Sequence, residues 1–257
     1  MKPASRDPGE LSPVPPFSPT PESREADASD AERAGRPVRD IPALGQERVV
    51  GKEDTREDMK PHGPYAGYYH ATYAIETHFA GGGGPTTGTA FAISGLTLLT
   101  ARHNWTLESD PEAEVTGIRL RKRNRAGVFE TLETGTIKRH DLDDDLAVMT
   151  LERGGSLRWM DLVLESDAAP KEEDAIWIVG YPGGTKAVSS TGVIRKLEYG
   201  LIHHDADPTR GVSGGAIIQQ DTGRVIGVHR GDARLGRHPN LNVGLMFSDT
   251  QLKNMRK

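Results

Sequence analysis

The sequence predicts an all-β fold, because three of its features indicate many short strands joined by turns. From Tyr65 onward, runs rich in β-branched and apolar residues alternate with glycine-containing turns, as in a barrel or a sandwich. Helical periodicity is almost absent until residues 248–256, which predict one short C-terminal helix. The roughly 190 residues of this region suit two small antiparallel barrels, and no repeat of about 20–50 residues is visible.

The expected strands run through the whole of this region. They lie at residues 70–79, 89–93, 96–101, 146–151, 175–179, 192–194, 216–218 and 225–228. The last two are joined by Asp221-Thr222-Gly223, which is typical of a hairpin turn. The four glycines at 81–84 predict a flexible hairpin loop, because the Lys and Ser/Thr of a phosphate-binding loop, and the helix after it, are missing.

The N-terminal part of the chain has a different composition. Nine of the 17 prolines lie in residues 1–42, and Phe17 is the only aromatic residue before Tyr65. Such a segment buries too little apolar surface to offset the entropy of ordering. We therefore expect a disordered, Pro-rich leader or propeptide at 1–48 and the folded domain at 49–257.

Charge, hydropathy and cysteine content exclude several functions. The net charge is -5 and no basic block is present, so nucleic acid is not expected as a partner. No apolar run approaches the roughly 20 residues that cross a bilayer, so no membrane association is expected. The N-terminus lacks the apolar segment of a secretory signal, which favours the cytoplasm by default. The absence of cysteine removes thiol catalysis, disulfides and thiolate metal sites, and no cofactor or metal is expected.

One serine stands among glycines in the stretch Gly-Val-Ser-Gly-Gly at 211–215. Ser213 fits both the nucleophile elbow of α/β-hydrolases and the glycine-flanked serine of chymotrypsin-like proteases. An elbow needs a helix directly after the serine, and its acid and histidine come later in the chain. Here a strand, a turn and a second strand follow, and too few residues remain for the rest of a hydrolase sheet. The partners of a catalytic Ser213 should therefore lie upstream, in the order histidine, aspartate, serine.

Two upstream residues stand at strand ends, where a ladder holds a side chain in a fixed orientation. Asp145 lies directly before the strand at 146–149, with Asp143 and Asp144 as rivals in the same acidic turn. His103 follows the strongly apolar strand at 96–101. These three residue types, in this order, favour a serine nucleophile, a histidine base and an orienting acid.

At these residues the sequence resembles the chymotrypsin-like serine proteases, and most closely the bacterial glutamyl endopeptidases. The resemblance extends from about residue 49 to the C-terminus. The matching stretches, in the family's order, are 97–100 leading to His103, 145–147, Gly-Tyr-Pro-Gly at 180–183, 211–215, Val-Ile-Gly-Val-His at 225–229, and the closing segment 242–257. The sequence departs from the glutamyl enzymes at Val212, where they usually carry Asn.

The resemblance implies two antiparallel six-stranded β-barrels with a catalytic cleft between them. The implied activity is that of a monomeric serine endopeptidase on protein or peptide substrates. His103 would take the proton of Ser213 and later give it to the leaving amine, while Asp145 would orient His103. The backbone N–H groups of Gly211 and Ser213 would form the oxyanion hole.

The resemblance also implies a specificity pocket. His229 occupies the position where glutamyl endopeptidases bind the acidic side chain before the scissile bond, and Thr209 would add a hydroxyl. Asp207 stands six residues before Ser213, at the spacing where trypsins bind Lys or Arg. We expect cleavage after Glu or Asp, with cleavage after Lys or Arg as the alternative.

The stretch Glu47-Arg48-Val49-Val50-Gly51 resembles a processing junction of the same family. A mature chain would begin at Val49 or Val50. In the glutamyl enzymes that free amine helps to bind the acidic substrate side chain, and an α-amine with a pKa of about 7.7–8.0 is largely cationic at neutral pH. The sequence therefore predicts a zymogen.

Two other functions stay open at this point. One is a catalytically silent protease-like domain that binds a partner, and the other is a Deg-type protease, against which the lack of a following peptide-binding module counts. Relatives of the glutamyl type are mostly exported, which conflicts with the missing signal. His203 and His204 are neighbours on an expected strand and point to opposite faces, so a surface or strand-edge role is expected for them instead of one shared metal.

Overall fold

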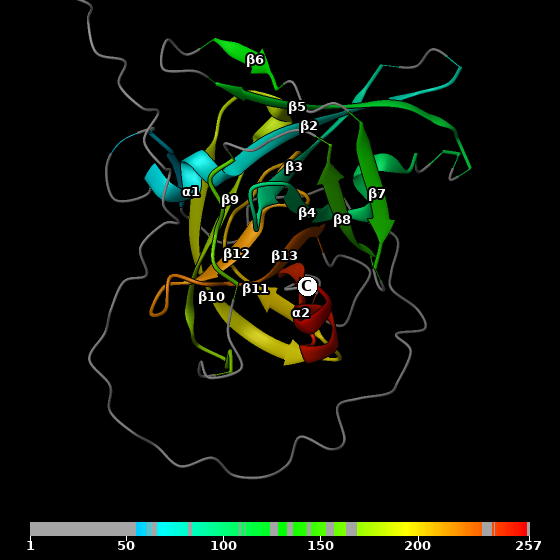
Figure 1. Ribbon diagram of the computed structural model, residues 1–257. Helices are drawn as coiled ribbons and strands as arrows, with labels where there is room; N and C mark the ends of the chain where they lie inside the picture. Colours follow the sequence, from blue (N-terminus) through cyan, green and yellow to red (C-terminus); the bar gives the residue numbers. More distant parts are fainter. Residues whose placement is uncertain are drawn as a thin grey trace, which may run out of the picture.

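The computed structural model describes most of the chain after residue 54 (Figure 1). The described residues are 55–60, 62, 66–81, 84–107, 109–110, 112–123, 128–132, 136–142, 145–152, 157–162, 169–232, 238 and 240–255. The predicted leader at 1–48, the expected chain starts Val49 and Val50, and the rival acids Asp143 and Asp144 lie outside them.

The described residues form two antiparallel sheets, and the first is built by the N-terminal half of the domain. Its strands are β2 (Thr72–Phe79), β3 (Thr86–Ala92), β4 (Thr97–Ala101), β5 (Val115–Arg123), β6 (Phe129–Thr131), β7 (Ile137–Asp141) and β8 (Leu146–Leu151). Their spatial order is β6-β5-β2-β3-β4-β8-β7. Among the described residues no pairing joins β6 to β7, so this sheet curls into a half-barrel with two edges instead of the expected closed barrel. Exposed charged residues along β7 protect one of these edges from further pairing.

The second sheet closes on itself. Its strands are β1 (Arg56–Asp58), β9 (Ala175–Gly180), β10 (Val188–Glu198), β11 (Leu201–His204), β12 (Ala216–Gln219), β13 (Val225–Asp232) and β14 (Asn242–Met246). The order is β1-β10-β11-β14-β13-β12-β9, and β9 also pairs with β10. This extra pairing produces a closed six-stranded barrel, with β1 attached to the outside of β10.

In the part of the chain that the structure describes, two short α-helices accompany the sheets: α1 (Ala66–Ala71) and α2 (Asp249–Met255). The expected C-terminal helix is confirmed, and it starts at a capping box: Gln251 N donates to Ser248 Oγ at 3.3 Å, and Ser248 N donates to Gln251 Oε1 at 2.9 Å. In contrast, α1 takes residues that were expected to open the first strand, because it buries Tyr68 and Tyr69 in the core. None of the helices in the described ranges is long and apolar enough to cross a membrane.

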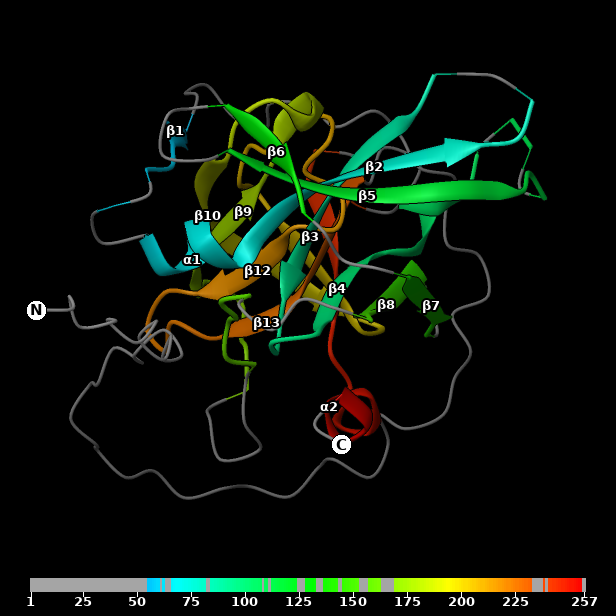
Figure 2. The same ribbon diagram turned by 45° about the horizontal axis from the view of Figure 1, so that its top comes forward.

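The two sheets share one apolar core. Buried residues of the first sheet, such as Phe91, Leu99 and Leu146, belong to the same cluster as Ile178 and Tyr181 of the barrel. Strand β13 of the barrel contacts β4 of the first sheet. Figure 2 shows that the long pair β2 and β5 extends beyond the rest of the first sheet. The strand ends that carry the candidate site are therefore held on a rigid apolar contact between the sheets.

Strand register brings the first two candidate residues together. β4 pairs with β8 so that Ala101, the last residue of β4, lies opposite Leu146, the first of β8. Residues 102–105 (Arg102–Trp105) leave β4 in a short 3₁₀ turn, η2. His103, two residues beyond the end of β4, therefore falls beside Asp145, one residue before the start of β8.

Candidate active site

His103 and Asp145 are joined by two hydrogen bonds. The ring Nδ1–H of His103 donates to Asp145 Oδ2 at 2.8 Å, and the backbone N–H of His103 donates to Asp145 Oδ1, also at 2.8 Å. Because one carboxylate accepts hydrogen bonds from both the ring and the main chain of the histidine, the imidazole has a fixed orientation and a fixed tautomer. The proton is on Nδ1, so Nε2 is left as the basic nitrogen.

Asp145 is a strained and buried residue. Its φ is 75°, in the left-handed region that few non-glycine residues adopt, and only 6% of its surface is exposed. Burial acts to raise the pKa of this carboxyl group, but the hydrogen bonds and charge of His103, together with the charge of Arg230, outweigh it and hold the pKa below its usual value. Asp145 is therefore an ionised carboxylate at neutral pH.

Arg230 is a third partner of this carboxylate, and sequence reasoning missed it. Its Nε donates to Asp145 Oδ2 at 3.0 Å, and the residue is 8% exposed. The register of β13 against β14 shifts between His229 and Gly231, so Arg230 lies in a β-bulge. A bulge turns a side chain away from strict alternation, and a sequence pattern with period 2 gives no signal of it.

Ser213 lies on the loop before β12, and the first sheet holds its carbonyl group. That oxygen accepts the N–H of Thr89 at 2.8 Å and the side-chain Nδ2 of Asn104 at 2.9 Å. Asn104 directly follows His103, so the turn that carries the histidine also fixes the serine loop. The hydroxyl Oγ of Ser213 donates to the carbonyl oxygen of Arg230 at 2.9 Å.

Gly211 has a backbone that only glycine accommodates well. Its φ is 100°, and a Cβ at this position would lie 2.4 Å from Gly183 N. The peptide bond before it is trans and its carbonyl, Arg210 O, accepts Gly183 N at 2.8 Å. The N–H of Gly211 therefore points to the opposite side. Its own carbonyl accepts the hydroxyl of Thr89 at 2.8 Å, which fixes the second peptide group of the loop.

His229 is fully buried beside the serine loop, on β13. Its N–H donates to Gly215 O and its carbonyl accepts Gly214 N, each at 2.8 Å, so its backbone holds the two residues after Ser213. Its ring Nδ1 lies 3.3 Å from Nε2 of His204 on β11. Burial, followed by the charges of His229 and His203, lowers the pKa of His204 well below its usual value, so His204 is neutral at neutral pH.

The other two predicted pocket residues precede the serine loop. Asp207 is fully buried, and its N–H donates to Ser190 Oγ on β10 at 2.7 Å. Thr209 is half-buried and its carbonyl accepts the N–H of Val212 at 3.1 Å. These contacts place both residues on the segment that leads into the serine loop.

The expected surface or strand-edge role of His203 and His204 is wrong. Their exposed fractions are 4% and 0%, because β11 lies inside the barrel wall between β10 and β14. The expected alternation holds: the ring of His204 contacts that of His229, whereas the ring of His203 contacts that of His238. Sequence reasoning saw the alternation but not that both faces of this strand are covered.

Comparison with known proteins agrees with this architecture. The chain matches the model of the trypsin-like peptidase domain over residues 88–228, a range that includes His103, Asp145, Gly211 and Ser213 and ends one residue before His229. A search of curated proteins finds no match.

Three solved structures are similar in fold. A Glu endopeptidase in complex with MPD has a TM-score of 0.59 and 16% identity, over 81% of this chain and 97% of that chain. A serine endoprotease from Yersinia pestis has a TM-score of 0.55 and 17% identity, over 74% of this chain and 62% of that chain. Deg5 has a TM-score of 0.56 and 20% identity, over 74% of this chain and 88% of that chain.

These three similarities concern the fold, since the identities are low. The match to the family model is of a different kind, because it spans more than half of the chain and contains the glycine-flanked serine, the histidine and the aspartate. The chain belongs to the trypsin-like peptidase family and is a serine-type endopeptidase.

Proposed function

We propose that this protein hydrolyses peptide bonds after Glu or Asp, through Ser213, His103 and Asp145. The observation that carries the catalytic part is the double hydrogen bond from His103 to Asp145, which leaves Nε2 of the ring as a base of fixed direction. The Asn104 side chain ties the serine loop to the same turn. Base and nucleophile are thus supported by one short segment.

The reaction follows from these positions. Ser213 Oγ attacks the scissile carbonyl carbon while His103 Nε2 takes its proton, and Asp145 stabilises the resulting imidazolium. The C–N bond then breaks, and His103 returns the proton to the leaving amine, which gives an acyl-enzyme. Water, deprotonated by His103, attacks the ester carbon; the bond from that carbon to Ser213 Oγ breaks, His103 returns the proton to Oγ, and the new carboxylic acid leaves.

The serine hydroxyl has to change its hydrogen bond before it attacks. It donates to Arg230 O in the structure. We propose that rotation about its Cα–Cβ bond to another staggered position brings the proton to His103 Nε2. The carbonyl of Arg230 then serves as the resting acceptor of a nucleophile that substrate binding turns toward its base.

The oxyanion would be bound by backbone N–H groups of the glycine loop. The Gly211 N–H points away from Gly183, and the carbonyls on both sides of it are held by Gly183 N and Thr89 Oγ1. Donors fixed in advance are favourable, because they stabilise the developing charge without reorganisation. We assign this role to the N–H groups of Gly211 and Ser213.

Labelling with a fluorophosphonate probe tests the catalytic part. We expect the wild-type protein to react at Ser213, with the modified peptide identified by mass spectrometry. The Ser213→Ala variant should not react, and His103→Ala should react at least a hundredfold more slowly. Absence of labelling in a correctly folded wild-type protein would favour the silent, partner-binding alternative.

The acidic preference is supported by the buried pair His204–His229. With His204 neutral, its Nε2–H can donate to Nδ1 of His229, so His229 carries its own proton on Nε2 and can donate it to a substrate carboxylate. Asp207 favours the alternative, because a buried carboxylate near the serine loop suits Lys or Arg.

A peptide library with every residue before the scissile bond separates the two preferences. We expect cleavage after Glu and Asp. His229→Gln should lower kcat/KM for Glu substrates by at least a hundredfold, and Asp207→Asn should not lower it. Cleavage after Lys and Arg that disappears in Asp207→Asn would instead establish the basic specificity.

We further propose that the chain is processed before Val49 or Val50. Strand β1 pairs with β10, and Thr55 Oγ1 lies 3.0 Å from the same Ser190 Oγ that accepts Asp207 N. The Ser190 side chain therefore links Thr55 to Asp207, which lies on the segment with the predicted pocket residues. Five or six residues reach up to about 20 Å when extended, so an α-amine at Val49 or Val50 has the pocket within range.

Comparison of the full chain with chains that begin at Val49 or Val50 tests this. We expect the shorter chains to hydrolyse a Glu peptide at least tenfold faster. N-terminal acetylation of the shorter chain should remove the gain, because it removes the positive charge. Equal activity of all forms would exclude a zymogen.

A further inference from the structure

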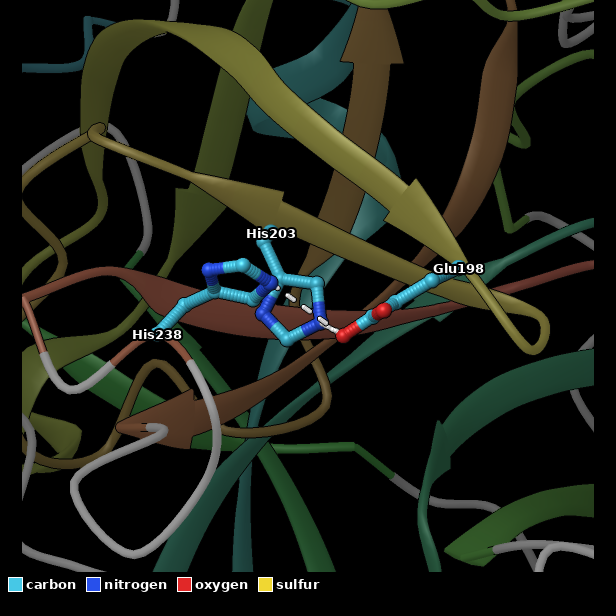
Figure 3. Close-up of side chains that lie close together, drawn as sticks. All are labelled: Glu198, His203 and His238. Atoms are coloured by element: carbon cyan, nitrogen blue, oxygen red, sulfur yellow. Dashed lines mark ion pairs between the residues drawn. The ribbon is translucent and has the colours of Figure 1, made fainter.

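A cluster of two histidines and one glutamate lies on the side of β11 away from the candidate active site. Glu198 ends β10, His203 lies on β11, and His238 precedes β14. Figure 3 shows the three side chains pointing toward one another from these separate segments. One ligand atom from each lies within 4.8 Å of the other two.

The distances within the cluster suit a shared ion better than hydrogen bonds. Glu198 Oε1 lies 3.6 Å from His203 Nε2 and 3.2 Å from His238 Nε2. Two ligand atoms that are each 2.0–2.1 Å from a tetrahedral zinc are about 3.3 Å apart. A distance of 3.6 Å is too long for a hydrogen bond, whereas both values are close to one edge of such a tetrahedron.

His203 is buried without any other use for its ring nitrogens. Its side chain is 5% exposed, and within the part of the chain that the structure describes neither Nδ1 nor Nε2 has a hydrogen-bond partner. The same holds for Nε2 of His238. Buried polar atoms left unpaired cost free energy, and an ion bound to them would remove this cost.

The charges around the cluster also favour a cation. Glu198 supplies one negative charge. The carboxylate of Glu172 also interacts electrostatically with His238, and Glu172 itself pairs with Lys196 at 2.8 Å. A neutral imidazole offers a lone pair to a metal, so the two histidines of the cluster are suitable ligands.

We propose that Glu198, His203 and His238 bind one Zn²⁺ ion, with water as the fourth ligand. Two imidazoles and a carboxylate form a donor set that zinc prefers, and the absence of cysteine excludes a thiolate site. Backbone geometry supports Glu198 and His238 as ligands. Glu198 lies one residue before the tight turn at Tyr199 and Gly200, and the carbonyl of His238 accepts the N–H of Leu241 at 3.0 Å.

The ion would link separate segments of the barrel to one another. It joins the β10–β11 hairpin to the connection between β13 and β14, and β13 carries His229 and Arg230. His203 is also the direct neighbour of His204, whose ring contacts His229. Zinc binding therefore stiffens the wall of the barrel behind the proposed specificity pocket, without contact with the reacting atoms.

Zinc titration of the full chain tests the site, in a Ser213→Ala background that prevents self-digestion and makes the test independent of catalysis. The protein is stripped with a chelator, and Zn²⁺ is added in competition with a chromophoric indicator. We expect one equivalent bound with a Kd in the micromolar range or below. At a hundredfold excess over Kd, zinc should raise the Tm by about 5–10 °C.

Variants locate the ion. His238→Ala and Glu198→Gln, at partly exposed positions, should each weaken binding at least tenfold and abolish the rise in Tm. The matched control is His78→Ala: His78 pairs with Glu76 at 2.8 Å and has a similar exposure, but among the described residues that pair has no third ligand. It should leave the Kd unchanged.

Co²⁺ gives an independent signal, since tetrahedral Co²⁺ absorbs strongly in the visible range. We expect this absorption in the parent and in His78→Ala, and its loss in His238→Ala. The proposal is overturned if no stoichiometric zinc binds. It is equally overturned if His238→Ala and Glu198→Gln bind zinc as tightly as the parent, because the ion then lies elsewhere.

Discussion

Arg230 and His103 share one oxygen of Asp145: Nε of Arg230 donates to Oδ2 at 3.0 Å, and Nδ1 of His103 donates to the same oxygen at 2.8 Å. A cation thus stands beside the carboxylate that is expected to stabilise the imidazolium. A nearby positive charge favours the ionised form of a carboxyl group, and Arg230 helps to hold the pKa of Asp145 below its usual value. Arg230 should therefore set the lower limit of the pH range in which Asp145 stays ionised and orients His103.

Replacement of Arg230 by Met tests this role. We expect the acidic limb of the kcat/KM profile to move to higher pH, because removal of the guanidinium raises the pKa of the Asp145 carboxyl group. The hydroxyl of Ser213 keeps its partner, which is the backbone carbonyl of Arg230. Arg230→Lys, which retains the charge, should return the acidic limb part of the way to its pH in the parent.

Arg121→Met is the matched control, because Arg121 lies on β5 of the first sheet and pairs with Glu76 at 2.9 Å instead of with Asp145. It should leave the profile unchanged. A lower plateau in Arg230→Met with an unmoved limb would mean that Arg230 only supports the structure.

Replacement of Asp145 by Asn should lower kcat by roughly 10³–10⁴-fold while binding of substrate changes little. An amide presents a donor where the carboxylate presents acceptors, so it favours the wrong tautomer of His103. Kinetic constants for one Glu peptide, measured with active-site titration of both proteins, provide the check. A loss of less than tenfold would show that His103 needs no orienting carboxylate.

Asp145 should also contribute to stability in a pH-dependent way. Its pKa is lower in the folded chain than in the unfolded chain, so at acidic pH the unfolded chain binds more protons. The contribution is complete above the ordinary Asp pKa of about 3.9 and is lost as pH falls through the folded pKa. Urea unfolding between pH 3 and 6 should therefore show a steeper loss in the parent than in Asp145→Asn.

Replacement of Gly211 by Ala should lower kcat about 10²–10³-fold. The added Cβ would lie 2.4 Å from Gly183 N and 3.0 Å from Tyr181 O, so the loop must move and its N–H leaves the oxyanion position. Gly81→Ala is the control, since Gly81 has a similar φ of 92° with no atom within 4 Å of an added Cβ. If both variants keep full activity, the oxyanion hole lies elsewhere.

Much of this site follows from rules about strand ends. The apolar runs before His103 and after Asp145 predict two strands, and their antiparallel pairing makes the two residues meet. The sequence also predicts the hairpin after Ser213, since Asp221-Thr222-Gly223 joins two apolar runs. The family resemblance adds the roles of these residues, which no periodicity supplies.

Other features depend on contacts that a single sequence does not encode locally. Arg230 reaches Asp145 only because a bulge breaks the period of β13, and a bulge arises from pairing with β14. His203 is buried because β10 and β14 flank its strand and His238 arrives from a distant connection. The half-barrel of the first sheet has the same origin, since its closure depends on edge pairing and not on strand content.

Lys122 carries an ammonium group in an unfavourable place, on β5. Burial, followed by the charge of Arg158, lowers its pKa to about 7. Its Nζ donates to His70 O and lies 4.6 Å from the ring centre of Tyr73. These contacts hold the group in position but do not replace the lost hydration.

The lowered pKa of Lys122 predicts that stability rises with pH. Between about pH 7 and the ordinary Lys pKa near 10.5, the unfolded chain binds the extra proton, so folding becomes more favourable as pH increases. Below pH 7 both states are charged and the full cost of burying the cation remains. Lys122→Met should therefore raise the free energy of unfolding by about 1–3 kcal/mol at pH 6 and by less at pH 9.

Urea unfolding of Ser213→Ala proteins at pH 6, 7.5 and 9 measures this difference without self-digestion. Lys186→Met is the matched control, because Lys186 is a surface lysine paired with Asp58 at 2.6 Å, and its effect should be small at every pH. A gain in Lys122→Met that is the same at pH 6 and pH 9 would mean that the methionine only improves packing. A loss at pH 6 would mean that the ammonium group, through His70 and Tyr73, stabilises the fold in its charged form.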